Sequence, residues 1–211
     1  PTELPPPVIG KTANAVPVAG VVLVKLPPGT TPKRAKQLGV RGAATGFIPL
    51  SEARQLPLGS TFDTTKGTVG LTTSGGAGKA DQQGNFNGSL FSTSQGAKNP
   101  LTTLSMTGGG LKGCNTRVPS GGAAKTVVAA AKRRRSLFSS VHGSFRTRGR
   151  NSSATVRGTE WTMTDTCAGT LTTVKQGAVL VRDFRLKKNK LVMAGHRYLA
   201  RAPMKKSKTK H

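Results

Sequence analysis

The sequence predicts an all-β fold of short strands with glycine-rich turns and at most one short helix. The 27 Gly and 13 Pro among 211 residues supply many turn positions. The apolar runs are short, and several alternate with polar residues, as the two-residue repeat of a half-buried strand requires. A chain of this length fits one large β domain or two small ones, and one domain is favoured. With 35% hydrophobic residues and only one Trp, the core is expected to be modest and mostly aliphatic.

The first part of the chain predicts a linker followed by a core strand. Residues 1–19 contain five prolines, which favour extended structure and resist packing into a sheet. Residues 20–26 form a largely apolar run of strand length, bounded by Gly20 and by two prolines. We therefore expect one domain over residues 20–202, preceded by a Pro-rich linker and followed by a basic tail, residues 203–211, that is too charged to fold alone.

The middle of the chain predicts further strands. Residues 31–41 are basic and rich in turn formers, and a strand is expected over residues 68–72, where Val69 and Leu71 share one face. Further core candidates follow in this part of the chain: Phe86, Leu90, Phe91, Leu101, Leu104 and Met106.

Residues 120–141 form a basic insertion. An alanine-rich stretch runs into four consecutive cations, residues 132–135. Alanine propensity favours a short helix at the edge of the sheet, whereas the basic run and flanking glycines fit an exposed loop nearly as well.

The last third of the chain carries the clearest strand pattern. Residues 154–161 and 169–183 alternate β-branched or large apolar residues with polar ones, and glycines mark the turns. Trp161 is expected to anchor the core. Residues 63–72 and 150–159 share a Thr-Val-x-x-Thr pattern, which stacked coils of a solenoid would produce, as would chance.

Several of these residues follow a family pattern: R-T, then A-x-V-R-G-T-x-aromatic, then V-x-x-G-x-V-x-V, and finally aliphatic-x-A-G. The matching residues are Arg146, Thr147, Ala154, Val156, Arg157, Gly158, Thr159, Trp161, Val174, Gly177, Val179, Val181, Val192, Ala194 and Gly195. Residues 58–72 look like the opening strands of the same family. In this arrangement the chain resembles the FecR family of extracytoplasmic bacterial domains over roughly residues 17–202, with a divergent middle.

The resemblance implies a solenoid or sandwich of short strands in a protein exported beyond the cytoplasmic membrane, whether periplasmic, cell-wall-associated or secreted. It makes the following residues structural: Arg157, Gly158, Thr159, Trp161, Gly177 and Gly195. Family members pass a signal from an outer-membrane transporter to a regulator, but this sequence lacks the membrane segment and regulator-binding region of that signalling. A structural, ligand-sensing or adhesive module of a surface protein is therefore the expected role.

The two cysteines, Cys114 and Cys167, bear on the compartment. An even count fits one disulfide in an oxidising compartment, or two unconnected buried thiols. The resemblance to an exported family favours the disulfide. Its absence would favour the cytosol.

The charge predicts a polyanionic partner. There are 33 Lys and Arg against 7 Asp and Glu, a formal net charge of +26. Candidate anion-binding residues are Lys132, Arg133, Arg134, Arg135, Arg146, Arg148, Arg150, Lys187 and Lys188. Anionic cell-envelope polymers or another surface protein are the expected partners. The alternative is a basic nucleic-acid-binding protein of ribosomal type, which is less favoured because few aromatic platforms accompany the cations.

The sequence offers no catalytic constellation. No two of the seven acids share a strand face at short spacing, since Glu160 and Asp165 are expected on opposite faces, and the three histidines match no ligand or triad pattern. No apolar stretch approaches the length of a transmembrane helix. We therefore expect no enzymatic activity, cofactor, metal or membrane span.

Overall fold

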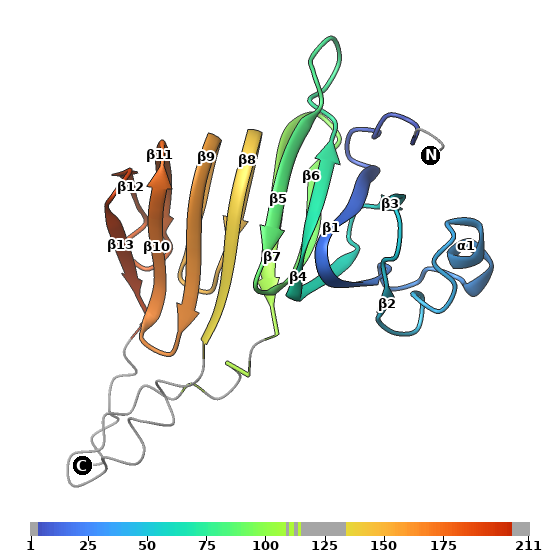
Figure 1. The fold of residues 1–211 in the computed structure, drawn as a ribbon. Helices are drawn as coiled ribbons and strands as arrows, with labels where there is room; N and C mark the ends of the chain where they lie inside the picture. Colours follow the sequence, from blue (N-terminus) through green and yellow to red (C-terminus); the bar gives the residue numbers. More distant parts are fainter. Residues whose placement is uncertain (1–3, 109, 112–113, 115–133, 204–211) are drawn as a thin grey trace, which may run out of the picture.

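The computed structural model describes residues 4–108, 110–111, 114 and 134–203, and these form an almost entirely β structure (Figure 1). The elements follow in the order β1 (Thr12–Lys25), α1 (Pro32–Gln37), β2 (Ile48–Pro49), β3 (Arg54–Pro57), β4 (Thr61–Thr73), β5 (Gln82–Asn87), β6 (Leu90–Gly96), β7 (Asn99–Thr107), β8 (Arg134–Arg148), β9 (Ser152–Thr166), β10 (Gly169–Gln176), β11 (Ala178–Asp183), β12 (Lys188–Met193) and β13 (Arg197–Arg201). The predicted all-β class is confirmed.

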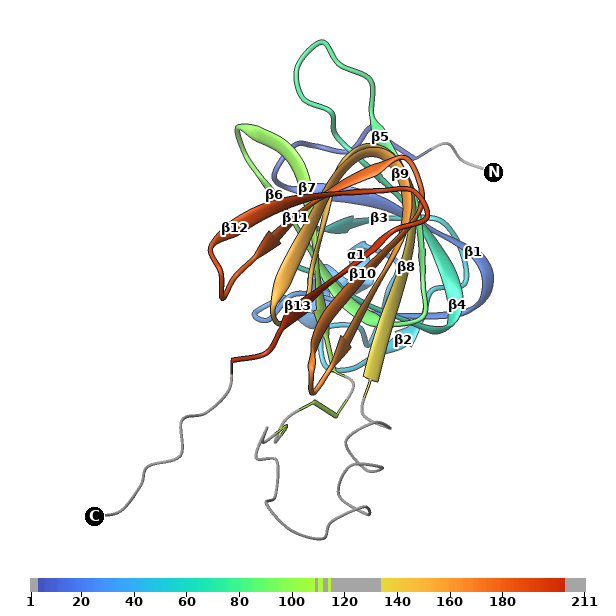
Figure 2. The ribbon, with the colours of Figure 1, turned by 90° about the vertical axis from the view of Figure 1, so that its left-hand side faces the viewer.

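All these strands belong to one hydrogen-bonded sheet that folds over into two layers. The long strands β1, β4, β8 and β9 run through both layers and change partners on the way. The first layer has the order β3-β1-β4-β5-β8-β9-β10-β13, and the second has β2-β1-β4-β6-β7-β8-β9-β11-β12. Figure 2 shows β11 and β12 diverging from β10 and β13 beyond β9.

The long strands bend where glycines let the backbones approach. Gly20 pairs with Gly67 across β1 and β4 and has a φ of +63°. A Cβ atom at Gly20 would lie 2.3 Å from the carbonyl oxygen of Lys66, and one at Gly67 would lie 2.6 Å from that of Val21. Only glycine fits at such a distance, so this pair permits β1 to cross from one layer to the other.

The expected boundary between linker and first strand is wrong. Residues 12–19 belong to β1, with Ala13 and Ala15 buried in the core, and Gly20 bends this strand instead of starting it. The pattern of small residues satisfies the two-residue repeat. Pro17, which cannot donate to the ladder, is tolerated beside the irregularity between Pro17 and Ala19.

The helix expected within residues 120–141 is not found in the described part of that segment. Residues 120–133 fall outside the described residues, and residues 134–141 are the first half of β8, where Leu137, Ser139 and Val141 point inward. The one described helix, α1, falls in the stretch interpreted as turns. Thr31 caps it by accepting a hydrogen bond from the Arg34 amide, 3.2 Å away, and Ala35 packs into the core.

The core lies between the two layers. Phe86 from the first layer contacts Phe91 and Phe145 from the second, with ring centroids 5.8 and 5.6 Å apart. Val69 and Leu71, expected to share one face, are both buried. Trp161, expected to anchor the core, is buried in the same cluster as Val174, Val179 and Val181. Of the other candidates, Leu90 and Leu101 are only partly buried.

The fold is not a solenoid. Stacked coils would pair successive strands in parallel, whereas β7 with β8 is the one parallel pair among the described strands. The two similar segments, residues 63–72 and 150–159, lie in β4 and at the start of β9, which do not pair with each other. Their similarity therefore reflects two threonine-rich strands and no repeated coil.

Candidate anion-binding groove

The strand register places two arginines in one cross-strand row on the outer face of the second layer. Arg148 of β8 is opposite Ser153 of β9, which is opposite Arg182 of β11, which in turn is opposite Asn189 of β12. Residues in register share a face of the sheet, so this row presents two cations and two polar groups to one side. The Nη1 atom of Arg182 is 3.4 Å from the Oδ1 atom of Asn189.

The next row joins a third arginine to an apolar pair. Arg146 is opposite Thr155, and its Nε atom donates to the Thr155 hydroxyl at 3.1 Å. Thr155 is opposite Leu180, and Leu180 is opposite Leu191. Across β8, β9, β11 and β12, this row therefore carries a cation, a hydroxyl group and two exposed leucines.

These rows form a groove of about 520 Å³, lined by Arg146, Arg148, Ser153, Thr155, Leu180, Arg182, Phe184 and Asn189. The Arg148 guanidinium carbon lies 4.9 Å from the centroid of the Phe184 ring, a cation–π contact that orients the side chain. Three guanidinium groups in one depression can hold a phosphate, sulfate or carboxylate through charge-assisted hydrogen bonds.

A buried carboxylate holds the turn that presents Phe184. Asp183, at the end of β11, accepts hydrogen bonds from the Leu186 amide at 2.9 Å and from the Tyr198 hydroxyl at 3.0 Å. Burial raises the pKa of Tyr198, and its hydrogen bond to Asp183 adds to the rise, while Arg185 opposes it. The hydroxyl thus remains a donor at neutral pH, and the turn stays attached to β13.

The groove continues along the molecule. A hollow of about 650 Å³ shares Thr155 and Leu180 with it, and a third of about 400 Å³ adds Lys79 and His142 and shares Arg157 with the second. None of the described residues that line these three hollows is an acid. We call the three together the groove, and its first part, around Arg146, Arg148 and Arg182, the arginine end.

The structure brings together two of the predicted anion-binding residues, Arg146 and Arg148, and adds Arg182, which the sequence analysis missed. The inward positions of Val179 and Val181 imply that Arg182 points outward, but only the pairing of β11 with β9 places it beside Arg148. Arg157, expected to be structural, is exposed and lines the groove. Its neighbour Gly158 has a φ of +69°, the left-handed conformation that favours glycine.

Other residues of the predicted family motif lie at the turns or in the core. Gly177 and Gly195 are turn residues with positive φ, and their two turns are joined by a hydrogen bond from the Ala194 amide to the Gly177 carbonyl, 2.9 Å long. Thr159 is buried, and its hydroxyl is 3.4 Å from the Ala178 carbonyl oxygen. Trp161 is fully buried.

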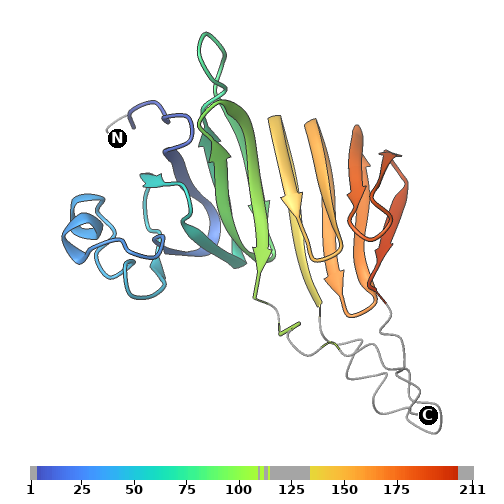
Figure 3. The ribbon, with the colours of Figure 1, turned by 180° about the vertical axis from the view of Figure 1, so that it is seen from behind.

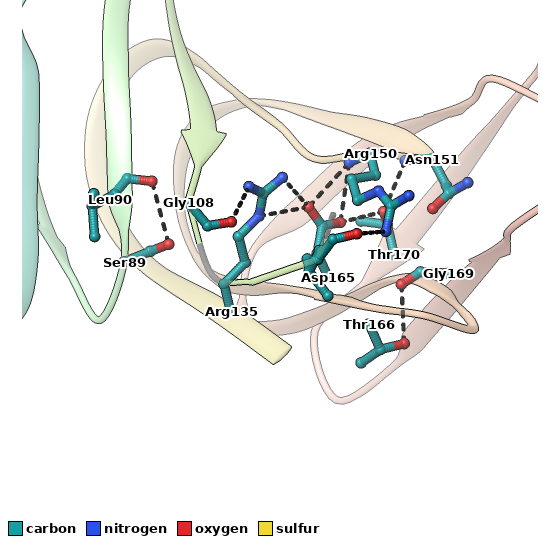
Figure 4. Close-up of polar contacts among 11 residues, drawn as sticks. Ser89, Leu90, Gly108, Arg135, Arg150, Asn151, Asp165, Thr166, Gly169 and Thr170 are labelled. Atoms are coloured by element: carbon teal, nitrogen blue, oxygen red, sulfur yellow. Dashed lines mark hydrogen bonds and ion pairs between the residues drawn. The ribbon is translucent and has the colours of Figure 1, made fainter. Parts of the chain in front are cut away.

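The remaining predicted cations are not in the groove. Arg134 and Lys188 are exposed at strand ends, and Lys187 is exposed in the turn before β12. Lys132 and Arg133 lie outside the described residues. Arg135 binds the buried Asp165 through its guanidinium group, and the exposed Arg150 donates its backbone amide to the same carboxylate (Figure 4). Adjacent cations in one charge run therefore differ in what they can bind.

Asp165 is fully buried and is the centre of this cluster. Its Oδ2 atom accepts from Nε and Nη2 of Arg135 at 3.0 and 2.7 Å, and both carboxylate oxygens lie 3.1 Å from the Arg150 amide. The Thr170 hydroxyl donates to Oδ1. The guanidinium groups also donate hydrogen bonds to backbone carbonyl oxygens, that of Arg135 to Gly108 and that of Arg150 to Leu111. The cluster thus connects the ends of four strands, β7 to β10.

Replacing Asp165 by Asn should lower the free energy of unfolding by about 1.5–3 kcal/mol, because the charge-assisted hydrogen bonds weaken while the volume is kept. Urea denaturation followed by circular dichroism measures the loss. The matched control is Glu160→Gln, which removes a partly exposed ion pair with Lys175 and should cost less than about 1 kcal/mol. Equal losses of unfolding free energy in the two variants would contradict the expectation that the buried interactions of Asp165 stabilise the protein more than the ion pair of Glu160 does.

The predicted Cys114–Cys167 disulfide is confirmed. The sulfur atoms are bonded, and the two Cα atoms are 5.2 Å apart. Cys167 lies two residues after Asp165 in the turn between β9 and β10, so the disulfide and the polar cluster hold the same end of the sheet.

Within the part of the chain that the structure describes, no three His, Cys, Asp or Glu side chains come together as metal ligands. The helix within this part of the chain is too short to cross a membrane.

The comparisons with known proteins identify no relative. No family model, no curated protein and no solved structure matches the chain. Membership of the FecR family therefore stays a prediction.

Proposed function

We propose that this protein is a non-enzymatic module that binds anionic components of the cell envelope, outside the cytoplasm, through the groove. The observation that carries the proposal is the convergence of Arg146, Arg148 and Arg182 on one face whose lining contains no described acid. A carboxylate there would compete for the guanidinium groups, as Asp165 does for Arg135.

The disulfide supports a location outside the cytoplasm, because disulfides persist in oxidising environments and are rare in the cytosol. It agrees with the FecR resemblance, which implies export, and the proposed role is adhesion to envelope anions or sensing of them. Among the described residues that line the groove, Phe184 is the one Phe, Tyr or Trp, and its ring already packs against Arg148. Single-stranded nucleic acid is usually bound on several free aromatic platforms, so the groove favours anions without bases.

A matched pair of triple variants tests the proposal. Arg146→Gln, Arg148→Gln and Arg182→Gln together remove the arginine end. The control, Lys33→Gln, Lys36→Gln and Arg41→Gln, removes the same charge from exposed positions in or near α1, at the opposite end of the sheet from β12 (Figure 3). Each variant lowers the formal charge of +26 by three.

At about 0.1 M salt the groove variant should lose at least about tenfold in affinity for a glycerol-phosphate polymer and for an acidic polysaccharide, because fewer condensed counterions are released. The control should lose about twofold. Fluorescence anisotropy with labelled polymers at two salt concentrations measures both. Equal losses would show diffuse surface charge instead of a groove, and tight, salt-resistant preference for one nucleic-acid sequence would support the ribosomal-type alternative.

A further inference from the structure

The arginine end opens directly onto an exposed apolar surface. Leu180 and Leu191 are cross-strand neighbours on β11 and β12 and are 44% and 57% exposed, and Met193, on the same face of β12, is 53% exposed. Scattered exposed leucines are ordinary on protein surfaces. Here they adjoin one another and lie beside three guanidinium groups, which is not ordinary.

Part of the wall of the central hollow is apolar. Leu101, Val156, Ala178, Leu180, Leu191 and the ring of Pro100 line it, together with the polar Asn99, Ser144, Thr155 and Thr159 and the cation Arg157. It shares Leu180 and Thr155 with the arginine end, so a single ligand can contact both without crossing a ridge of the surface. A highly charged polymer has no apolar group that would gain from contact with the exposed leucines of this wall.

We propose that the groove binds an anionic phospholipid, with the phosphate headgroup at the arginine end and an acyl chain along Leu180 and Leu191. The inference deepens the proposed function and rests on it. Guanidinium groups match phosphate oxygens in geometry and charge, and the leucines remove methylene groups from water. Charge complementarity selects this occupant over a neutral lipid, because the net charge of +26 and a lining in which no described residue is an acid attract an anionic headgroup.

The test compares three soluble probes by isothermal titration calorimetry on the whole chain with its disulfide intact. Monomeric dihexanoylphosphatidic acid carries both the phosphate and the chains, glycerol 3-phosphate carries the phosphate alone, and dihexanoylphosphatidylcholine carries the chains without net charge. Burial of two methylene groups corresponds to about a tenfold gain in affinity. Phosphatidic acid should therefore bind at least about tenfold more tightly than either of the other probes.

Two pairs of exposed apolar residues supply the matched variants. Leu180→Ser with Leu191→Ser should reduce phosphatidic acid binding to the level of glycerol 3-phosphate and leave the polymer titration unchanged. Val21→Ser with Leu199→Ser, at comparably exposed positions outside the groove, should change neither. The arginine triple variant should weaken every anionic probe.

The outcomes separate the two proposals. Equal binding of phosphatidic acid and glycerol 3-phosphate would overturn the lipid inference and leave the proposed function standing. Equal binding of phosphatidylcholine would overturn it as well, because the arginines would then contribute nothing. A homodimer in sedimentation velocity that Leu191→Ser converts to monomers would assign the apolar surface to a second copy. Loss of arginine dependence for every probe would overturn the proposed function itself.

Discussion

Trp161→Ala should lower the free energy of unfolding by about 3–5 kcal/mol, because it leaves a cavity in a close-packed core. The side chain is fully buried and belongs to the same core cluster as Val174, its cross-strand neighbour on β10, and Val179. Among the described residues its indole nitrogen has no hydrogen-bond partner, so the loss is one of packing. Urea denaturation followed by far-ultraviolet circular dichroism measures it, since the variant lacks the one tryptophan of the chain.

Two other variants calibrate this result. Trp161→Phe keeps an aromatic ring and sacrifices no hydrogen bond, so it should cost clearly less than the alanine variant. Leu199→Ala, at a site 40% exposed, should stay within about 1 kcal/mol of the parent. A loss below about 1 kcal/mol for Trp161→Ala would mean that Trp161 does not anchor the core.

Removing the Cys114–Cys167 disulfide should lower the free energy of unfolding by about 4 kcal/mol, because the unfolded chain gains the entropy of an open loop. The two cysteines are 53 residues apart in sequence, which sets that magnitude. The measurement compares urea denaturation of the parent with that of the Cys114→Ser, Cys167→Ser double variant, both without reductant.

A reductant provides the internal control. It should lower the unfolding free energy of the parent to nearly that of the double variant, and it should leave the unfolding free energy of the double variant unchanged. Two thiols that react with iodoacetamide in the native, unreduced protein would contradict the disulfide. They would also remove the main support for a location outside the cytoplasm.

The sequence by itself determined the local structure wherever a two-residue alternation is visible. Val69 and Leu71, expected on one face of a strand, are both buried, and so are Val179 and Val181 in the alternating run 169–183, because side-chain direction in a strand depends on parity alone. The burial of Trp161 followed from its place in such a run. The same signal failed at β1, where Gly20 was interpreted as a boundary, because a glycine that bends a strand and one that ends it look alike in sequence.

The groove depended on the tertiary structure. Arg135 and Arg146 belong to similar basic runs on the same strand, yet Arg135 binds the buried Asp165, 30 residues away, while Arg146 lines the groove. Arg182 and Arg148 share a row only because both are paired with Ser153 on the strand between them. Strand register brings together residues that are distant in the chain, and charge and spacing carry no information about it. The sequence therefore determined that the protein is basic and β, and the pairing of strands decided which cations are available to a ligand.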